Sequence, residues 1–137
     1  MKTIIASEDE LSVVVDYLNA TIPKDAIIFL VGDLASGKTT LTQYIARDRG
    51  VDGEITSPTF SLQQCYSTNL YHYDLYRIDN SEFMELGLFE EFDKSGWHMV
   101  EWGDKALKEF LLSVGYGIFT VTITPYKDRR KYTIEKS

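Results

Sequence analysis

Residues 32–39 read Gly-Asp-Leu-Ala-Ser-Gly-Lys-Thr and match the phosphate-loop pattern G-x-x-x-x-G-K-[ST] at every fixed position. The residues before the loop, 26–31, form an apolar run rich in β-forming side chains, which is typical of a buried parallel strand. Residues 39–49, after the loop, contain neither Gly nor Pro and place apolar side chains at helical spacing. The sequence therefore predicts a strand, a glycine loop and a helix that begins at Lys38, which is the context this motif requires.

The predicted geometry makes the loop an anion-binding site. Its backbone N–H groups point inward, and the helix adds the partial positive charge of its N-terminal end. Gly32 and Gly37 allow the close approach that a Cβ would obstruct. Lys38 is expected to reach the β- and γ-phosphates, and Thr39 to offer its hydroxyl to Mg²⁺. The predicted nucleotide-binding residues are Gly32, Asp33, Leu34, Ala35, Ser36, Gly37, Lys38, Thr39 and Thr40.

Length and composition describe an ordinary globular chain. Its 137 residues predict one domain over 1–137, and 44% hydrophobic and 26% charged residues are typical values. The net charge of -7 argues against a surface built mainly to hold nucleic acid. The local basic stretch Lys127, Arg129, Arg130 and Lys131 is interpreted as a solvated turn rather than an RNA contact. A single Cys excludes an internal disulfide, and the absence of a long apolar segment predicts a cytoplasmic protein with no membrane contact.

Further elements are predicted on both sides of the loop. Residues 2–5 are expected to form an edge strand, and a capping box at Ser7 and Glu10 precedes a helix with an apolar face. Alternation over 60–66 and 70–78 predicts a hairpin around a turn at 67–69. We then expect a helix over 82–86 capped by Asn80–Ser81, a strand over 97–100, a helix over 106–112, and a hairpin of 117–124 with 131–135. The sequence thus predicts an α/β fold with a parallel centre and antiparallel hairpin additions.

Two acidic residues compete for the role that hydrolysis requires beyond phosphate binding. Asp74 lies in a predicted strand, where burying an unpaired carboxylate would be costly. Glu101 follows an apolar run, at the strand end where phosphate sites of open α/β sheets form. A salt bridge from Asp74 to Arg77, or a solvated strand end at Glu101, would be the structural alternatives. We expect both acids near Mg²⁺, one of them through water.

Residues 56–59, Thr-Ser-Pro-Thr, follow the predicted loop helix and could form a mobile segment over the γ-phosphate, with Thr59 near the metal. A plain β-turn carrying hydroxyls is the alternative for these residues. His72 and His98 are interpreted as partly buried structural histidines and are assigned no chemistry.

Several segments together resemble the TsaE family, also called YjeE. They are the loop G-D-L-A-S-G-K-T-T, T-S-P-T-F, Y-H-Y-D-L-Y-R-I, E-L-G-L and the E-W pair, and the resemblance spans roughly residues 25–105. It implies a three-layer P-loop NTPase-like sandwich that binds ATP and Mg²⁺ and hydrolyses ATP weakly. It also implies work with TsaB-like and TsaD-like partners in threonylcarbamoylation of tRNA adenosine 37, with tRNA contacted through that complex.

The resemblance carries family roles to matching positions. Lys38, Asp74 and Glu101 become the candidate catalytic residues; Thr39, Glu101 and Asp74 the candidate metal ligands; and Thr59 and Trp102 further nucleotide contacts. The sequence departs from the family pattern at Ala35–Ser36, where Gly-Ala is usual, and at Gly103–Asp104, where Pro-Glu is usual.

Three other classes of function are weighed against this one. A small-molecule kinase would need an acceptor pocket and an Arg-rich lid, for which no extra segment is available. A GTPase would need an N-K-x-D segment to read guanine, and the chain has none. A non-catalytic nucleotide-binding module would keep Lys38 while tolerating the loss of Asp74 and Glu101.

Overall fold

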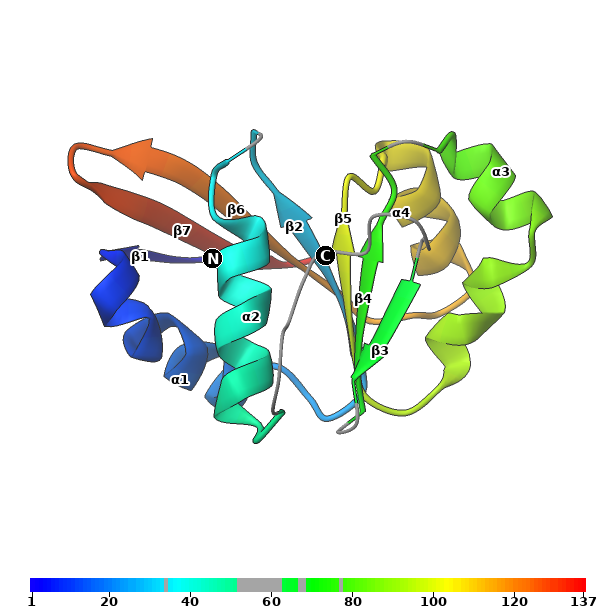
Figure 1. Cartoon of the computed structure of the whole chain (residues 1–137). Coiled ribbons are helices and arrows are strands. Elements are labelled where there is room, and N and C mark those ends of the chain that lie inside the picture. Colours follow the sequence, from blue (N-terminus) through cyan, green and yellow to red (C-terminus); the bar gives the residue numbers. More distant parts are fainter. Residues whose placement is uncertain (34, 52–62, 67–68, 77) are drawn as a thin grey trace.

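A computed structural model describes residues 1–33, 35–51, 63–66, 69–76 and 78–137. Its strands form one sheet in the order β1-β7-β6-β2-β5-β4-β3 (Figure 1). The elements in chain order are β1 (Lys2–Ala6), the 3₁₀ helix η1 (Glu8–Glu10), α1 (Leu11–Thr21), β2 (Ala26–Val31), α2 (Lys38–Asp48), β3 (Gln63–Tyr66), β4 (Leu70–Asp74), α3 (Asn80–Glu85), the 3₁₀ helix η2 (Leu88–Asp93), β5 (Trp97–Glu101), α4 (Lys105–Ser113), β6 (Ile118–Tyr126) and β7 (Arg129–Lys136).

The centre of the sheet is parallel and its margins are antiparallel. β2 pairs in parallel with β5 and β6, and β4 pairs in parallel with β5. β3 adds to β4, and β7 adds to β6 and to the edge strand β1, all in antiparallel pairs. The predicted α/β fold with a parallel centre and hairpin additions is confirmed.

Helices cover both faces of this sheet, which explains the continuous apolar run in β2. Ile28 and Leu30 belong to a core shared with α1 and α2, whereas Ile27 and Phe29 belong to a core shared with α3 and α4. Figure 1 shows the two helix pairs on opposite sides of the sheet. A central strand buried on both faces has no position that favours a polar side chain. None of the described helices is long and apolar enough to span a membrane.

Two predicted boundaries are wrong for a local reason. β4 ends at Asp74 rather than at Ile78, because the Asp74 carboxylate accepts the N–H of Tyr76 at 3.0 Å and bends the chain out of the sheet. α3 is capped by Asp79 rather than by Asn80–Ser81: the Asp79 carboxylate accepts the N–H of Ser81 at 2.9 Å. The first strand of the central hairpin is described from Gln63, so its predicted start at residue 60 lies outside the described residues.

Candidate functional site

The phosphate loop leaves the carboxyl end of β2 and enters α2 at Lys38, as predicted. A Cβ on Gly32 would lie 2.5 Å from Ser36 Oγ and 2.8 Å from the carbonyl oxygen of Ile123, so only glycine fits there. Gly37 caps α2 with a φ of 106°, in the left-handed region. Ala35 also adopts a left-handed conformation, with a φ of 62°. The loop therefore has the turn that its glycine pattern predicted, and its Leu34 lies outside the described residues.

Lys38 closes the loop from the inside. The side chain is buried, and its ammonium donates hydrogen bonds to the carbonyl oxygen of Gly32 and, at 3.2 Å, to that of Asp33. It also lies 3.9 Å from the ring centroid of Trp102, close enough for a cation–π interaction. The ammonium of Lys38 is thus held by two loop carbonyls and an aromatic face.

Two strand ends bring the predicted acids beside the loop. Asp74 and Glu101 are register partners at the carboxyl ends of β4 and β5, and Glu101 is in turn level with Leu30 of β2. Glu101 is buried, and its Oε2 accepts the hydroxyl of Thr39 at 3.3 Å. The structure thus brings together the hydroxyl and the carboxylate that were predicted as Mg²⁺ ligands.

His72 is a member of this site that the sequence interpretation missed. Its Nε2 forms a short contact with Glu101 Oε2, and both side chains are buried. The contact fixes the carboxylate oxygen that also faces Thr39, so His72 is a positioning residue for Glu101. Strand alternation could have predicted this role. Residues 72 and 74 share one face of β4, and β4 pairs with β5, which ends at Glu101. His98, by contrast, bonds Tyr73 and the carbonyl oxygen of Lys94, as expected of a structural histidine.

Burial is the main electrostatic influence on the loop lysine. It lowers the pKa of Lys38, because the charged ammonium is held away from water. The carboxylates of Glu101, Asp74 and Asp33 act in the opposite direction and help to keep the side chain charged. The site therefore holds a cation that burial destabilises, a condition that an arriving anion would relieve.

The oxygen donors at this site suit Mg²⁺, which needs few protein ligands, better than a metal ion that is coordinated entirely by protein side chains. Among the described residues, no group of three or more His, Cys, Asp and Glu side chains could hold a metal ion. Thr39 and Glu101 supply two oxygens at one point, with Asp74 on the adjacent strand. Mg²⁺ commonly takes one or two carboxylates and completes its shell with water and substrate phosphates. These residues fit such an ion when it arrives with a nucleotide.

The segment after Glu101 departs from the family pattern for structural reasons. Trp102 has a φ of 63°, and its ring lies 4.9 Å from that of Tyr76. A Cβ on Gly103 would lie 2.7 Å from the Phe29 ring, so the backbone passes too close for a larger residue. Asp104 caps α4 by accepting the N–H of Leu107 at 2.7 Å. Gly103 and Asp104 thus shape the chain around the site.

Of the remaining predicted site residues, the structure describes some and not others. Thr40 lies in the first turn of α2, next to Thr39. Thr59 and the whole segment 56–59 lie outside the described residues, as does Arg77, the alternative partner of Asp74.

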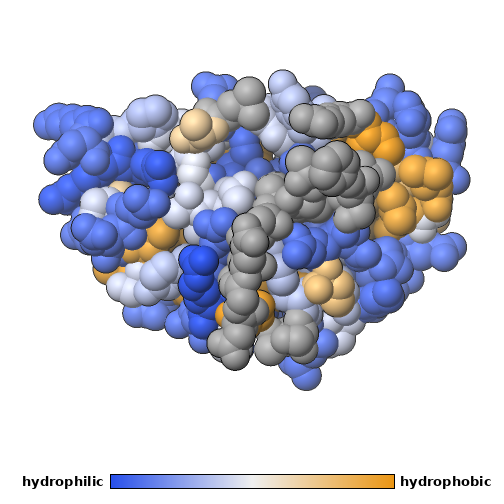
Figure 2. Space-filling model, in the orientation of Figure 1, coloured by the Kyte–Doolittle hydropathy of each residue, from blue (hydrophilic) through white to orange (hydrophobic). Residues whose placement is uncertain are grey.

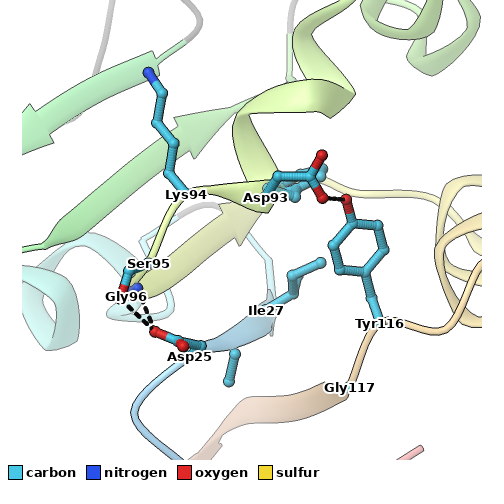
Figure 3. Close-up of a pocket in the computed structure, with 10 residues that line it drawn as sticks. Asp25, Ile27, Asp93, Lys94, Ser95, Gly96, Tyr116 and Gly117 are labelled. Carbon is cyan, nitrogen blue, oxygen red and sulfur yellow. Dashed lines mark hydrogen bonds between the residues drawn. The ribbon is translucent and has the colours of Figure 1, made fainter.

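A second polar cluster lines a cavity at the opposite end of β2 and β5 (Figure 3). The Asp25 carboxylate accepts Ser95 Oγ at 2.7 Å and the N–H of Gly96 at 2.8 Å. Tyr116 donates its hydroxyl to Asp93 across the same cavity. These groups bond one another, and the bonds of Asp25 tie the starts of two strands together.

A glycine loop between a parallel strand and a helix, with a buried acid at the end of the next strand, defines a P-loop NTPase-like protein. A family model described as Threonylcarbamoyl adenosine biosynthesis protein TsaE matches residues 5–132. The chain belongs to the TsaE family.

Relatives and a solved structure agree with this membership. The chain is 36% identical over 86 residues to "tRNA threonylcarbamoyladenosine biosynthesis protein TsaE" of Haemophilus influenzae, covering 60% of this chain and 54% of that protein. It is 38% identical over 108 residues to the protein of the same name from Rickettsia bellii, covering 75% and 74%. The crystal structure of Bacillus subtilis YdiB superposes with a TM-score of 0.69 at 26% identity, covering 97% of this chain and 84% of that one. The chain spans only 54 to 64% of the length of the Haemophilus, Treponema pallidum and Rickettsia felis relatives.

Proposed function

We propose that the protein binds ATP with Mg²⁺ and hydrolyses it slowly, in the service of tRNA threonylcarbamoyladenosine biosynthesis. The observation that carries this proposal is the meeting of Lys38, Thr39 and Glu101 at the mouth of the phosphate loop. A purely structural salt bridge would explain why a lysine and a carboxylate lie close together. It would not require the glycine turn before the lysine or the burial of the lysine side chain.

Each residue has a distinct role in this proposal. The loop amides and Lys38 hold the phosphates, and Lys38 exchanges its bonds to the carbonyls of Gly32 and Asp33 for bonds to phosphate oxygens. Thr39 and Glu101 would hold Mg²⁺, which neutralises developing phosphate charge when it is bound. Asp74, on the adjacent strand, is the candidate for orienting water.

The proposal includes TsaB-like and TsaD-like partners in the cytoplasm, with tRNA reached through them. The relatives' names support the pathway, and the net charge of -7 supports indirect contact with RNA. Apolar surface suited to a protein partner gathers on the side where α3 lies (Figure 2). Leu86, at the end of α3, is 63% exposed, and Tyr76, which contacts Trp102, is 54% exposed. A partner seated there would lie next to the site and could complete it.

ATP binding and turnover test this proposal in three variants. We expect Lys38→Ala to weaken ATP·Mg²⁺ binding by roughly a hundredfold, because a charged contact to phosphate is lost. We expect Glu101→Ala and Asp74→Ala to bind ATP within a few-fold of the wild type and to lose about a hundredfold in turnover. Binding is measured by titration calorimetry, and turnover by phosphate release with and without TsaB-like and TsaD-like proteins and tRNA.

The outcomes separate the classes of function. Lys38→Ala with wild-type ATP affinity would remove the nucleotide site. Wild-type turnover and wild-type tRNA modification by both acid variants would leave a non-catalytic binding module. Glu109→Ala, an exposed change on α4, serves as the control that should alter neither quantity.

A further inference from the structure

Arg130, near the start of β7, reaches the phosphate loop from the side opposite to Lys38's acidic neighbours. Tyr132 and Ile134, which share its strand face, pack into the core with α1 and α2. Arg130 precedes these two residues on β7, where it pairs in register with Pro125 of β6 and Ala6 of β1. A Cβ built on Gly37 would lie 2.5 Å from Arg130 Nη1 and 2.9 Å from Cζ. The guanidinium therefore rests directly on the last glycine of the loop.

One nitrogen of the guanidinium lacks a hydrogen-bond partner in the described part of the chain. Its Nη1 is buried and has no hydrogen-bond partner among the described residues. No carboxylate in that part of the chain forms an ion pair with it, whereas the neighbouring Arg129 approaches Glu10 at 3.9 Å. Ser36 Oγ in the loop is likewise buried and has no hydrogen-bond partner among the described residues. Buried donors left unpaired are costly, so the arrangement favours an arriving acceptor.

The charge balance shows which kind of acceptor fits. Lys38 is opposed by the carboxylates of Glu101, Asp74 and Asp33, but Arg130 forms no ion pair among the described residues. The site thus has a second cation on the β7 side, without an ion-pair partner in the part of the chain that the structure describes. A planar guanidinium pairs best with carboxylate or phosphate, and the loop it touches is built for phosphate. Burial raises the pKa of Tyr132, and the Arg130 guanidinium partly opposes that rise.

We propose that Arg130 is a second phosphate-binding cation of this site, which grips the nucleotide's phosphates from the β7 side while Lys38 holds them from the β5 side. The inference rests on the proposed ATP-binding function. It corrects the interpretation of the basic stretch 127–131 as a solvated turn, because one of its arginines turns inward onto the loop.

The test compares three variants by titration calorimetry with ATP·Mg²⁺, ADP, AMP and inorganic tripolyphosphate. We expect Arg130→Gln to weaken ATP and tripolyphosphate binding about tenfold or more, and to make ATP affinity less dependent on salt. Arg130→Lys should lie between it and the wild type. The matched control Arg129→Gln, at an exposed position one residue away, should stay within about twofold of the wild type.

Each result decides one question. Wild-type ATP affinity and salt dependence in Arg130→Gln would overturn the inference, as would a loss confined to RNA binding. If thermal denaturation shows that Arg130→Gln is less stable, Arg130→Lys carries the same comparison, because it keeps the charge and most of the stem. Loss of ATP binding in Lys38→Ala together with unchanged ATP binding in Arg130→Gln would overturn the role of Arg130 and leave the proposed ATP-binding function intact. Unchanged binding in Lys38→Ala would sink the proposed function itself.

Discussion

Two residues at the site adopt backbone conformations that glycine normally supplies. Ala35 and Trp102 have φ values of 62° and 63°, and the Lys38 ammonium lies 3.9 Å from the Trp102 ring centroid. A left-handed conformation costs a residue with a Cβ roughly 1–2 kcal/mol. Ala35 stands where the resembled family has glycine, so alanine at this position places backbone strain in the loop. Strain of this kind persists only where surrounding contacts impose it.

Ala35→Gly should therefore stabilise the protein by about 0.5–1 kcal/mol, with some of the gain offset by the greater freedom of glycine in the unfolded chain. Gly50→Ala provides the mirror-image control, because Gly50 has a φ of 85° and open space around its Cβ position. That control should destabilise by about 1 kcal/mol. Urea denaturation of both variants measures the sign of the change in the free energy of unfolding. Destabilisation by Ala35→Gly would contradict the assignment of strain to this position.

At the scale of elements, parallel pairing turns separate strand ends into one site. β4, β5 and β2 all end at the same edge of the sheet, and their last residues deliver Asp74, Glu101 and the loop. α4 then begins directly after the Glu101–Trp102–Gly103 segment and packs Leu107 and Leu111 into the second core. The cap of α4 therefore anchors the segment that carries the acid and the tryptophan.

Asp104→Ala should lower the free energy of unfolding by about 1 kcal/mol, because the N–H of Leu107 loses its capping acceptor. Asp104→Ser retains a capping oxygen and should stay within about 0.5 kcal/mol of the wild type. Chemical denaturation followed by far-UV circular dichroism checks both. An equal loss in the two variants would show that the carboxylate acts through something other than the cap.

At the scale of the whole molecule, the two ends of the sheet differ in how their polar groups are hydrogen-bonded. The carboxyl end gathers around a loop a buried lysine, acids, and a guanidinium nitrogen that has no hydrogen-bond partner among the described residues. The opposite end gathers polar groups that bond one another, with Asp25 clamping the start of β5 (Figure 3). The first arrangement supports the proposed binding of a phosphate ligand, and the second stabilises the fold.

Asp25 should make stability depend on acid. Hydrogen bonds from Ser95 and Gly96 lower the pKa of Asp25 in the folded protein. Its stabilising contribution is thus complete above the ordinary aspartate pKa of about 3.9 and is lost as pH falls through the folded value. The difference in stability between wild type and Asp25→Asn should be constant from pH 7 to about 5 and shrink below about 4. Thermal denaturation across this range measures it, and a difference that stays constant down to pH 3 would contradict the clamp.

The sequence by itself determined the phosphate loop, the strand and helix around it, and the class of fold, because these follow from local chemistry: two glycines, an apolar run and a helical face. It also predicted Glu101 as a strand-end acid beside the loop. Only the tertiary structure decided that His72 holds Glu101, that Lys38 lies against the Trp102 ring, and that Arg130 reaches Gly37. These contacts join residues far apart in the chain, and strand register and helix packing set them rather than any local pattern.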